Sequence, residues 1–98
     1  MAEIRFQWDD KKAAVNKAKH GVSFEEAKSV FYDEDALLRI DEENSKDEDR
    51  FVLLGLSAHL RTLAVCHCYR ESDEVIRLIS ARKADRAERA QYEARRKR

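Results

Sequence analysis

The sequence predicts an α+β domain in which an N-terminal strand and two helices pack on a mainly antiparallel sheet, with a helix at the C-terminus. Three observations lead to this class. The chain has 98 residues, which suits one domain with a modest core. Helix start and stop signals gather in its first third. Four apolar stretches then follow one another without an intervening helix, which favours antiparallel pairing. We expect the helices on one face of the sheet and part of the other face open.

The N-terminal elements are predicted from turn and cap residues. Residues 4–8 alternate apolar and polar side chains, as a short strand does. Asp9 is a good N-cap for a helix that Gly21, one of only two glycines, would end. Ser23 and Glu26 form an S-x-x-E capping box that begins a second helix. The apolar side of that second helix comprises Phe24, Ala27, Val30 and Phe31.

The rest of the chain reads as four strands and a helix. The strands are expected at 36–40, 51–56, 62–69 and 75–79. The acidic segment 41–49 is too polar to be buried and should be a solvated loop, whereas residues 70–74 should join the last two strands as a hairpin. Residues 84–98 lack β-branched side chains and fit a helix that frays into a basic tail.

Three separated blocks of the sequence resemble the BrnT family of bacterial toxins. They are F-Q-W-D at 6–9, K-H-G-V-S-F-E-E-A at 19–27 and I-R-L-I-S-A-R-K-A at 76–84, and the resemblance covers almost the whole chain. It implies a RelE-like endoribonuclease that inhibits translation and is neutralised by a BrnA-like antitoxin, whose DNA-binding dimer would connect the complex to DNA only indirectly. RNA transesterification uses the substrate's own 2′-hydroxyl, so we expect neither metal nor cofactor. The alternative is a non-catalytic interaction module that binds an antitoxin or nucleic acid through a basic face.

The zero net charge conceals a segregation of charges along the chain. Residues 33–49 contain nine acidic and two basic side chains, whereas residues 82–98 contain eight basic and three acidic ones. Such asymmetry predicts one surface that attracts phosphate and another that repels it. No apolar run approaches about 18 residues, and no signal-peptide pattern is present, so we expect a cytoplasmic protein without a membrane span.

Two cysteines flank a histidine in the third of the four predicted strands. Cys66 and Cys68 should point to one face and His67 to the other, because side chains alternate along a strand. With no second ligand pair elsewhere, this pattern does not predict a metal site. We expect two reduced thiols and a half-buried structural histidine.

Arg77 is the strongest candidate for a catalytic residue. It lies in the middle of the otherwise apolar segment 75–79, where a charge must be paired or face a functional surface. One interpretation pairs Arg77 with an acidic side chain such as Glu74, and the other uses its guanidinium to hold a scissile phosphate bidentately. Arg70 and Arg82 flank the same hairpin and would join Arg77 as electrostatic clamp residues, or remain solvated surface arginines.

Lys19 and His20 are weaker catalytic candidates. At a helix C-terminus a histidine commonly interacts with the helix dipole. The alternative is proton transfer, or a phosphate contact that His20 shares with Lys19.

The C-terminal segment supplies candidate RNA-binding residues. These are Lys83, Arg86, Arg89 and Tyr92. The basic side chains would bind phosphates, and Tyr92 would stack on a base or pack against the sheet. The same basic segment is also compatible with a solvated helix end, or with a contact to an acidic segment of the antitoxin.

Overall fold

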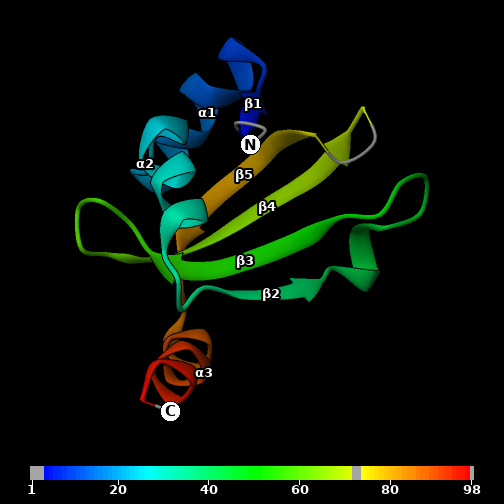
Figure 1. The fold of residues 1–98 in the computed structure, drawn as a ribbon. Helices are drawn as coiled ribbons and strands as arrows, with labels where there is room; N and C mark the ends of the chain where they lie inside the picture. The colour runs from blue at the N-terminus through cyan, green and yellow to red at the C-terminus, as the bar shows by residue number, and fades with distance from the viewer. Residues whose placement is uncertain (1–3, 72–73, 98) are drawn as a thin grey trace.

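In the part of the chain that the structure describes, five strands form one sheet in the order β1-β5-β4-β3-β2, and three helices flank it (Figure 1). The structure, a computed structural model, describes residues 4–71 and 74–97. The strands are β1 (Arg5–Gln7), β2 (Leu37–Ile40), β3 (Phe51–Leu56), β4 (Thr62–Arg70) and β5 (Val75–Lys83). The helices are α1 (Asp10–His20), α2 (Phe24–Ser29) and α3 (Arg86–Arg96), with short 3₁₀ turns η1 (Val30–Tyr32) and η2 (Glu42–Asn44). All strand pairs are antiparallel except β1 with β5.

The predicted class and element order are confirmed, with two differences in extent. β5 continues through Lys83 rather than ending at residue 79, because it keeps pairing with β4 beyond a bulge at Cys66/His67. The acidic segment 41–49 is not entirely loop but contains η2. Residues 72–73 of the expected hairpin connection and Arg98 of the expected basic tail lie outside the described residues.

The predicted caps fix both ends of α1 and the start of α2. Asp9 accepts hydrogen bonds from two backbone N–H groups of the first turn, and Gly21 ends α1 in the left-handed conformation at φ 70°. Ser23 Oγ accepts the backbone N–H of Glu26 at 3.0 Å. The reciprocal half of the expected capping box does not form, because the Glu26 carboxylate binds Arg61 and Ser57 instead.

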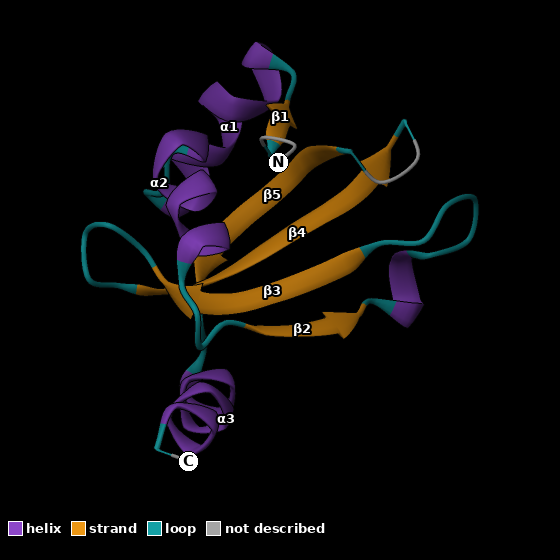
Figure 2. Cartoon of the chain, viewed as in Figure 1, coloured by secondary structure: helices purple, strands orange, loops and turns teal. Residues whose placement is uncertain are grey.

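The main core lies between α1, α2 and one face of the sheet, which we call the first face. Its helical side contains Val22, Phe24, Ala27 and Val30, and its sheet side contains Leu53, Leu63, Val65, Ile76, Leu78 and Ala81. A smaller apolar cluster on the second face contains Leu37, Val52, Leu54 and Ala64. α1 and α2 lie together near one end of the sheet, and α3 lies apart from them (Figure 2).

The expectation that all helices share one face is wrong for α3. Glu88 of α3 binds Arg82 and Arg39. Those arginines stand in register with Ala64 and Val52, which belong to the second-face cluster. β5 therefore sends the chain to the other side of the sheet, and the two charged contacts hold α3 there.

Candidate nucleic-acid interface

The outer edge of β5 meets α1 rather than a full-length strand. β1 pairs with β5 only as far as Arg77, which stands opposite Gln7. Further along, the buried amide of Asn16 accepts the N–H of Ala81 at 3.0 Å and donates to its carbonyl at 2.8 Å. Nδ2 of Asn16 also donates to Val22 O at 2.9 Å. Asn16 thus takes the place of a strand residue and fixes α1 against the edge of β5.

A basic pocket of about 320 Å³ opens between α1 and β5. Its basic side chains are Lys11, Lys12, Lys19 and His20. They surround Val15, which is 64% exposed, and face Ile79 and Ser80 of β5. Across residues 4–71 and 74–97, none of these lysines has a carboxylate within ion-pair distance. The pocket can therefore attract phosphate without first breaking an ion pair.

The structure brings the predicted pair Lys19 and His20 together with two lysines that the sequence analysis missed. The spacing of Lys11 and Lys12 could have indicated this. In a helix, residues four and eight positions apart lie on one side, so Lys11 lies on the side of Lys19, and Lys12 on the side of His20. Within the described part of the chain, neither ring nitrogen of His20 has a hydrogen-bond partner. Both nitrogens are therefore open to a hydrogen bond with a ligand.

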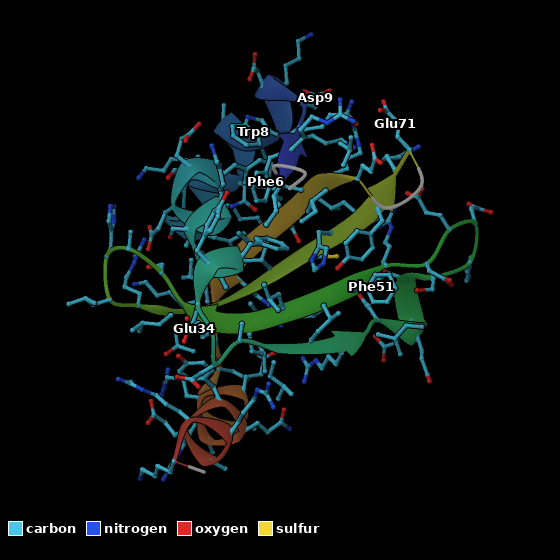
Figure 3. All side chains as sticks on the ribbon, viewed as in Figure 1. Phe6, Trp8, Asp9, Glu34, Phe51 and Glu71 are labelled. Carbon is cyan, nitrogen blue, oxygen red and sulfur yellow. The ribbon has the colours of Figure 1, made fainter. Side chains whose placement is uncertain are left out.

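Arg77 lies on the second face, half-buried, and its Nη1 donates to Gln7 Oε1 at 3.1 Å. The proposed pairing with Glu74 is wrong, because Glu74 binds Arg5 at 3.6 Å and Glu71 binds the same guanidinium at 3.3 Å. Glu71 directly follows the end of β4 (Figure 3). No carboxylate within residues 4–71 and 74–97 forms an ion pair with Arg77. Its positive charge is unbalanced on this face.

Arg70 and Arg82 share the second face with Arg77 but do not meet at one point. Arg70 is two residues beyond Cys68, the register partner of Arg77, and binds Glu48 at 3.4 Å. Arg82 is five residues from Arg77, or about 16 Å along an extended strand. Its two terminal nitrogens bind the two oxygens of Glu88 at 2.6 and 3.0 Å. Arg70 is therefore near Arg77, whereas Arg82 belongs to a separate ion-pair network.

That network predicts a specific pH dependence of stability. The hydrogen bonds from Arg82 are the main reason why the pKa of Glu88 falls from 4.5 to about 2. A pKa depressed in the folded state adds stability that is present above the unfolded pKa and lost as pH falls toward 2. We expect Glu88→Gln to lower the free energy of unfolding at pH 7 on the order of 2–3 kcal/mol, with the difference narrowing steadily below pH 4.5. Urea unfolding at several pH values measures this.

Glu93→Gln provides a matched control on the exposed side of α3. It should shift stability by well under about 0.5 kcal/mol at every pH. A Glu88→Gln difference that stays constant between pH 7 and pH 2.5 would contradict the assigned linkage.

The C-terminal candidates divide into accessible and inaccessible residues. Lys83, Arg86 and Arg89 are exposed, and Arg89 donates to Ala84 O at 3.1 Å. Tyr92 is 1% exposed, and its hydroxyl donates to Asp33 Oδ2 at 2.6 Å. Burial, reinforced by that bond, raises the pKa of Tyr92 to about 12. The base-stacking role is therefore wrong for Tyr92, because its ring packs inside the protein.

His67, Cys66 and Cys68 have environments that fit a structural role. His67 is fully buried rather than half-buried, and its ring packs edge-on against Phe31 and Tyr69. Burial lowers the pKa of His67 and raises the pKa of the free thiols of Cys66 and Cys68. In the described residues, no three His, Cys, Asp or Glu side chains are grouped to hold a metal ion. No helix within the same residues is long and apolar enough to cross a membrane.

The chain matches a protein-family model and a solved structure. Residues 8–88 match the family model described as the ribonuclease toxin BrnT of a type II toxin-antitoxin system. The fold matches the crystal structure of the Brucella abortus ribonuclease toxin BrnT with a TM-score of 0.62 and 24% sequence identity, covering 86% of this chain and 100% of the other. The comparison with curated proteins found no significant match.

Proposed function

The chain belongs to the BrnT family of ribonuclease toxins of type II toxin-antitoxin systems, and we propose that it cleaves RNA internally, without a metal, at the surface along β5. In this reaction the 2′-hydroxyl oxygen attacks the adjacent phosphorus and loses its proton. The bond from phosphorus to the 5′ oxygen breaks, and that oxygen takes up a proton. The products are a 2′,3′-cyclic phosphate and a 5′-hydroxyl end.

The observation that supports this proposal most is the unbalanced guanidinium of Arg77 on the second face. Five other arginines are paired with carboxylates: Arg5, Arg39, Arg61, Arg70 and Arg82. Positive charge fixed before the reaction stabilises the extra negative charge of the pentacoordinate phosphorus. The bond to Gln7 holds the guanidinium in place, so its orientation does not have to be created when RNA binds.

The basic pocket complements Arg77 by binding the RNA backbone. Lys11, Lys12 and Lys19 would contact phosphates along the edge of β5, and His20 is the candidate for proton transfer. Arginine is not suited to that step, because it stays protonated at neutral pH. Arg70 would add positive charge next to Arg77 once RNA displaces Glu48.

The family implies an antitoxin partner, and we propose that it is a BrnA-like DNA-binding dimer. Such a partner would neutralise the toxin and link it to DNA only indirectly. Free toxin would lower translation in the cytoplasm by cutting RNA there. The exposed basic side chains at the end of β5 and on α3, which are Lys83, Arg86 and Arg89, would bind either RNA or an acidic segment of that partner.

The test is incubation of the purified, antitoxin-free protein with a defined RNA in EDTA, followed by analysis of the new 3′ ends. Cyclic-phosphate ends would establish cleavage by transesterification without a metal. Intact RNA in the presence of folded protein would contradict cleavage of free RNA and favour a binding module or ribosome-dependent cutting. Adding purified ribosomes with messenger RNA distinguishes these alternatives, because only a ribosome-dependent nuclease would then cut the RNA.

We also predict that Lys19→Ala weakens RNA binding in a salt-dependent manner. Each phosphate contact with a single strand contributes about 0.7 to the slope of log affinity against log salt concentration. The Lys19→Ala slope should therefore be shallower by about that amount, as measured by fluorescence anisotropy with labelled RNA at several salt concentrations. Lys17→Ala is the matched control, since Lys17 is exposed on the same helix but does not line the basic pocket. Equal slopes for the two variants would show that the basic pocket does not contact RNA phosphates.

A further inference from the structure

A second pocket of about 280 Å³ lies on the second face, on the other side of β5 from the basic pocket. Its floor is formed by the β3 and β4 side chains Val52, Ala64 and Cys66. Ile79 and Ser80 line both pockets. A nucleotide whose phosphate occupies the basic pocket could therefore place its base across β5 in the second pocket.

The wall opposite β5 carries a hydrogen-bond acceptor beside a donor. Asp41 and Arg50 are cross-strand neighbours, since the Asp41 N–H donates to Arg50 O at 2.8 Å. Ser45 braces both residues, because its hydroxyl donates to Asp41 O at 2.6 Å and accepts the Arg50 N–H at 2.9 Å. Asp41 Oδ2 accepts from Asn44 Nδ2 at 3.0 Å. The carboxylate is thus held in a fixed position.

Both side chains have unused hydrogen-bonding capacity. Arg50 Nε is buried and has no hydrogen-bond partner among the residues that the structure describes. Within residues 4–71 and 74–97, Asp41 and Arg50 form no ion pair with each other, and Asp41 Oδ1 accepts no hydrogen bond. A buried donor left unpaired costs about 1–3 kcal/mol, which a ligand acceptor would recover.

We propose that this pocket binds a guanine base of the RNA. Guanine presents the acceptors O6 and N7, which suit a guanidinium, and arginine to these two atoms is the commonest specific contact to a base. Its N1–H and N2–H groups are donors that suit a carboxylate. Adenine and cytosine carry an amino donor where guanine has O6, and a ring-nitrogen acceptor where guanine has N1–H, so they would oppose a donor to Arg50 and an acceptor to Asp41. Uracil keeps an acceptor and an N–H at these positions but lacks the N7 acceptor and the N2–H donor, so it would form fewer of the bonds. The inference rests on the proposed function for its substrate, RNA.

The experiment compares binding of guanosine, adenosine, cytidine and uridine 3′-monophosphates, by NMR titration of the amide signals of the wild-type protein. Guanosine 3′-monophosphate should bind about tenfold tighter or more than the other three, because a good base contact is worth about 1–3 kcal/mol of discrimination. The perturbed signals should come from residues lining the second pocket. Asp41→Asn, which keeps the shape of the side chain, should abolish the preference. Glu42→Gln, an exposed change next to it outside the pocket, should preserve it.

Cleavage of a random-sequence RNA pool then separates this inference from the proposed function. If the wild-type protein cuts next to guanine and Asp41→Asn cuts without preference for a base, both the guanine pocket and the proposed function are supported. Preferential binding of the guanine nucleotide without any cleavage supports the guanine pocket and contradicts the proposed function. Equal binding of the four nucleotides, no binding of any, or preference for another base overturns the guanine pocket, whether or not RNA is cut. If Asp41→Asn does not fold, Asn44→Ala is the second variant. Asn44 is exposed and lines the second pocket, and its removal takes away the donor that holds Asp41 Oδ2, so this variant should weaken the preference for guanine.

Discussion

Arg77→Ala is expected to lower the rate of RNA cleavage by about 100- to 1,000-fold, the usual effect of removing one preorganised group that stabilises transition-state charge. The fold should be preserved, because the only side-chain hydrogen bond of Arg77 within the described residues is the one to Gln7. A single-turnover assay with excess protein measures the rate of the cleavage step. Circular dichroism and thermal unfolding check the structure.

Arg5→Ala is the matched control for this change. Arg5 is an exposed arginine on the strand next to Arg77, but Glu71 and Glu74 already balance its charge. We expect its removal to change the rate by less than about threefold, since exposed ion pairs contribute little. Arg77→Lys should recover part of the lost rate, because it restores the charge but not the planar fork. A folded Arg77→Ala protein that cleaves as fast as the Arg5→Ala protein would exclude Arg77 from the site.

Arg61→Ala is expected to lower the free energy of unfolding clearly more than an exposed substitution does, because it leaves the buried carboxylate of Glu26 without its main ionic partner. The side chain of Glu26 is 1% exposed and receives hydrogen bonds from Arg61 Nε at 2.9 Å and from Ser57 Oγ at 2.7 Å. Arg61 Nη2 also contacts this carboxylate and donates to Gly21 O at 3.1 Å. The hydrogen bonds from Arg61 are the main reason why the pKa of Glu26 is lowered.

Urea unfolding at neutral pH measures this loss, and Arg95→Ala serves as an exposed control that should change stability by less than about 0.5 kcal/mol. Because the lowered pKa of Glu26 stabilises the wild-type protein above the unfolded pKa, the difference between wild type and Arg61→Ala should shrink as pH falls below that value. The double variant Glu26→Gln with Arg61→Ala should be more stable than Arg61→Ala alone. A double variant that loses the sum of both single effects would show that the two residues act independently.

Short-range chemistry explains why most of the fold was predictable. Asp9, Gly21 and Ser23 act on backbone groups within four residues, so their roles follow from the local sequence. The central strands follow from apolar patterns over six to nine residues. The extension of β5 and the position of α3 depend instead on contacts with distant strands. No local pattern encodes those contacts.

The candidate site was predictable only in part, for the same reason. Lys19 and His20 lie in one pocket because they are adjacent on a helix. The balance of charge on each arginine, in contrast, depends on tertiary neighbours: Arg82 meets Glu88 of α3, and Arg70 meets Glu48 of the acidic segment. Tyr92 packs toward Asp33, which is 59 residues away in the sequence. Binary patterns indicate that a residue is buried or charged, but not which partner it finds.

The contact of Asn16 with Ala81 also bears on the behaviour of the protein at high concentration. An unpaired strand edge is a template on which a second chain can add its own strand, and such addition leads to aggregation. β1 protects β5 over only three residues, and Asn16 occupies the N–H and carbonyl of Ala81 beyond that point. Helix α1, which lines the basic pocket, therefore also blocks intermolecular strand pairing along β5. A loss of α1 packing would expose an unpaired, aggregation-prone strand edge and would also remove an RNA contact.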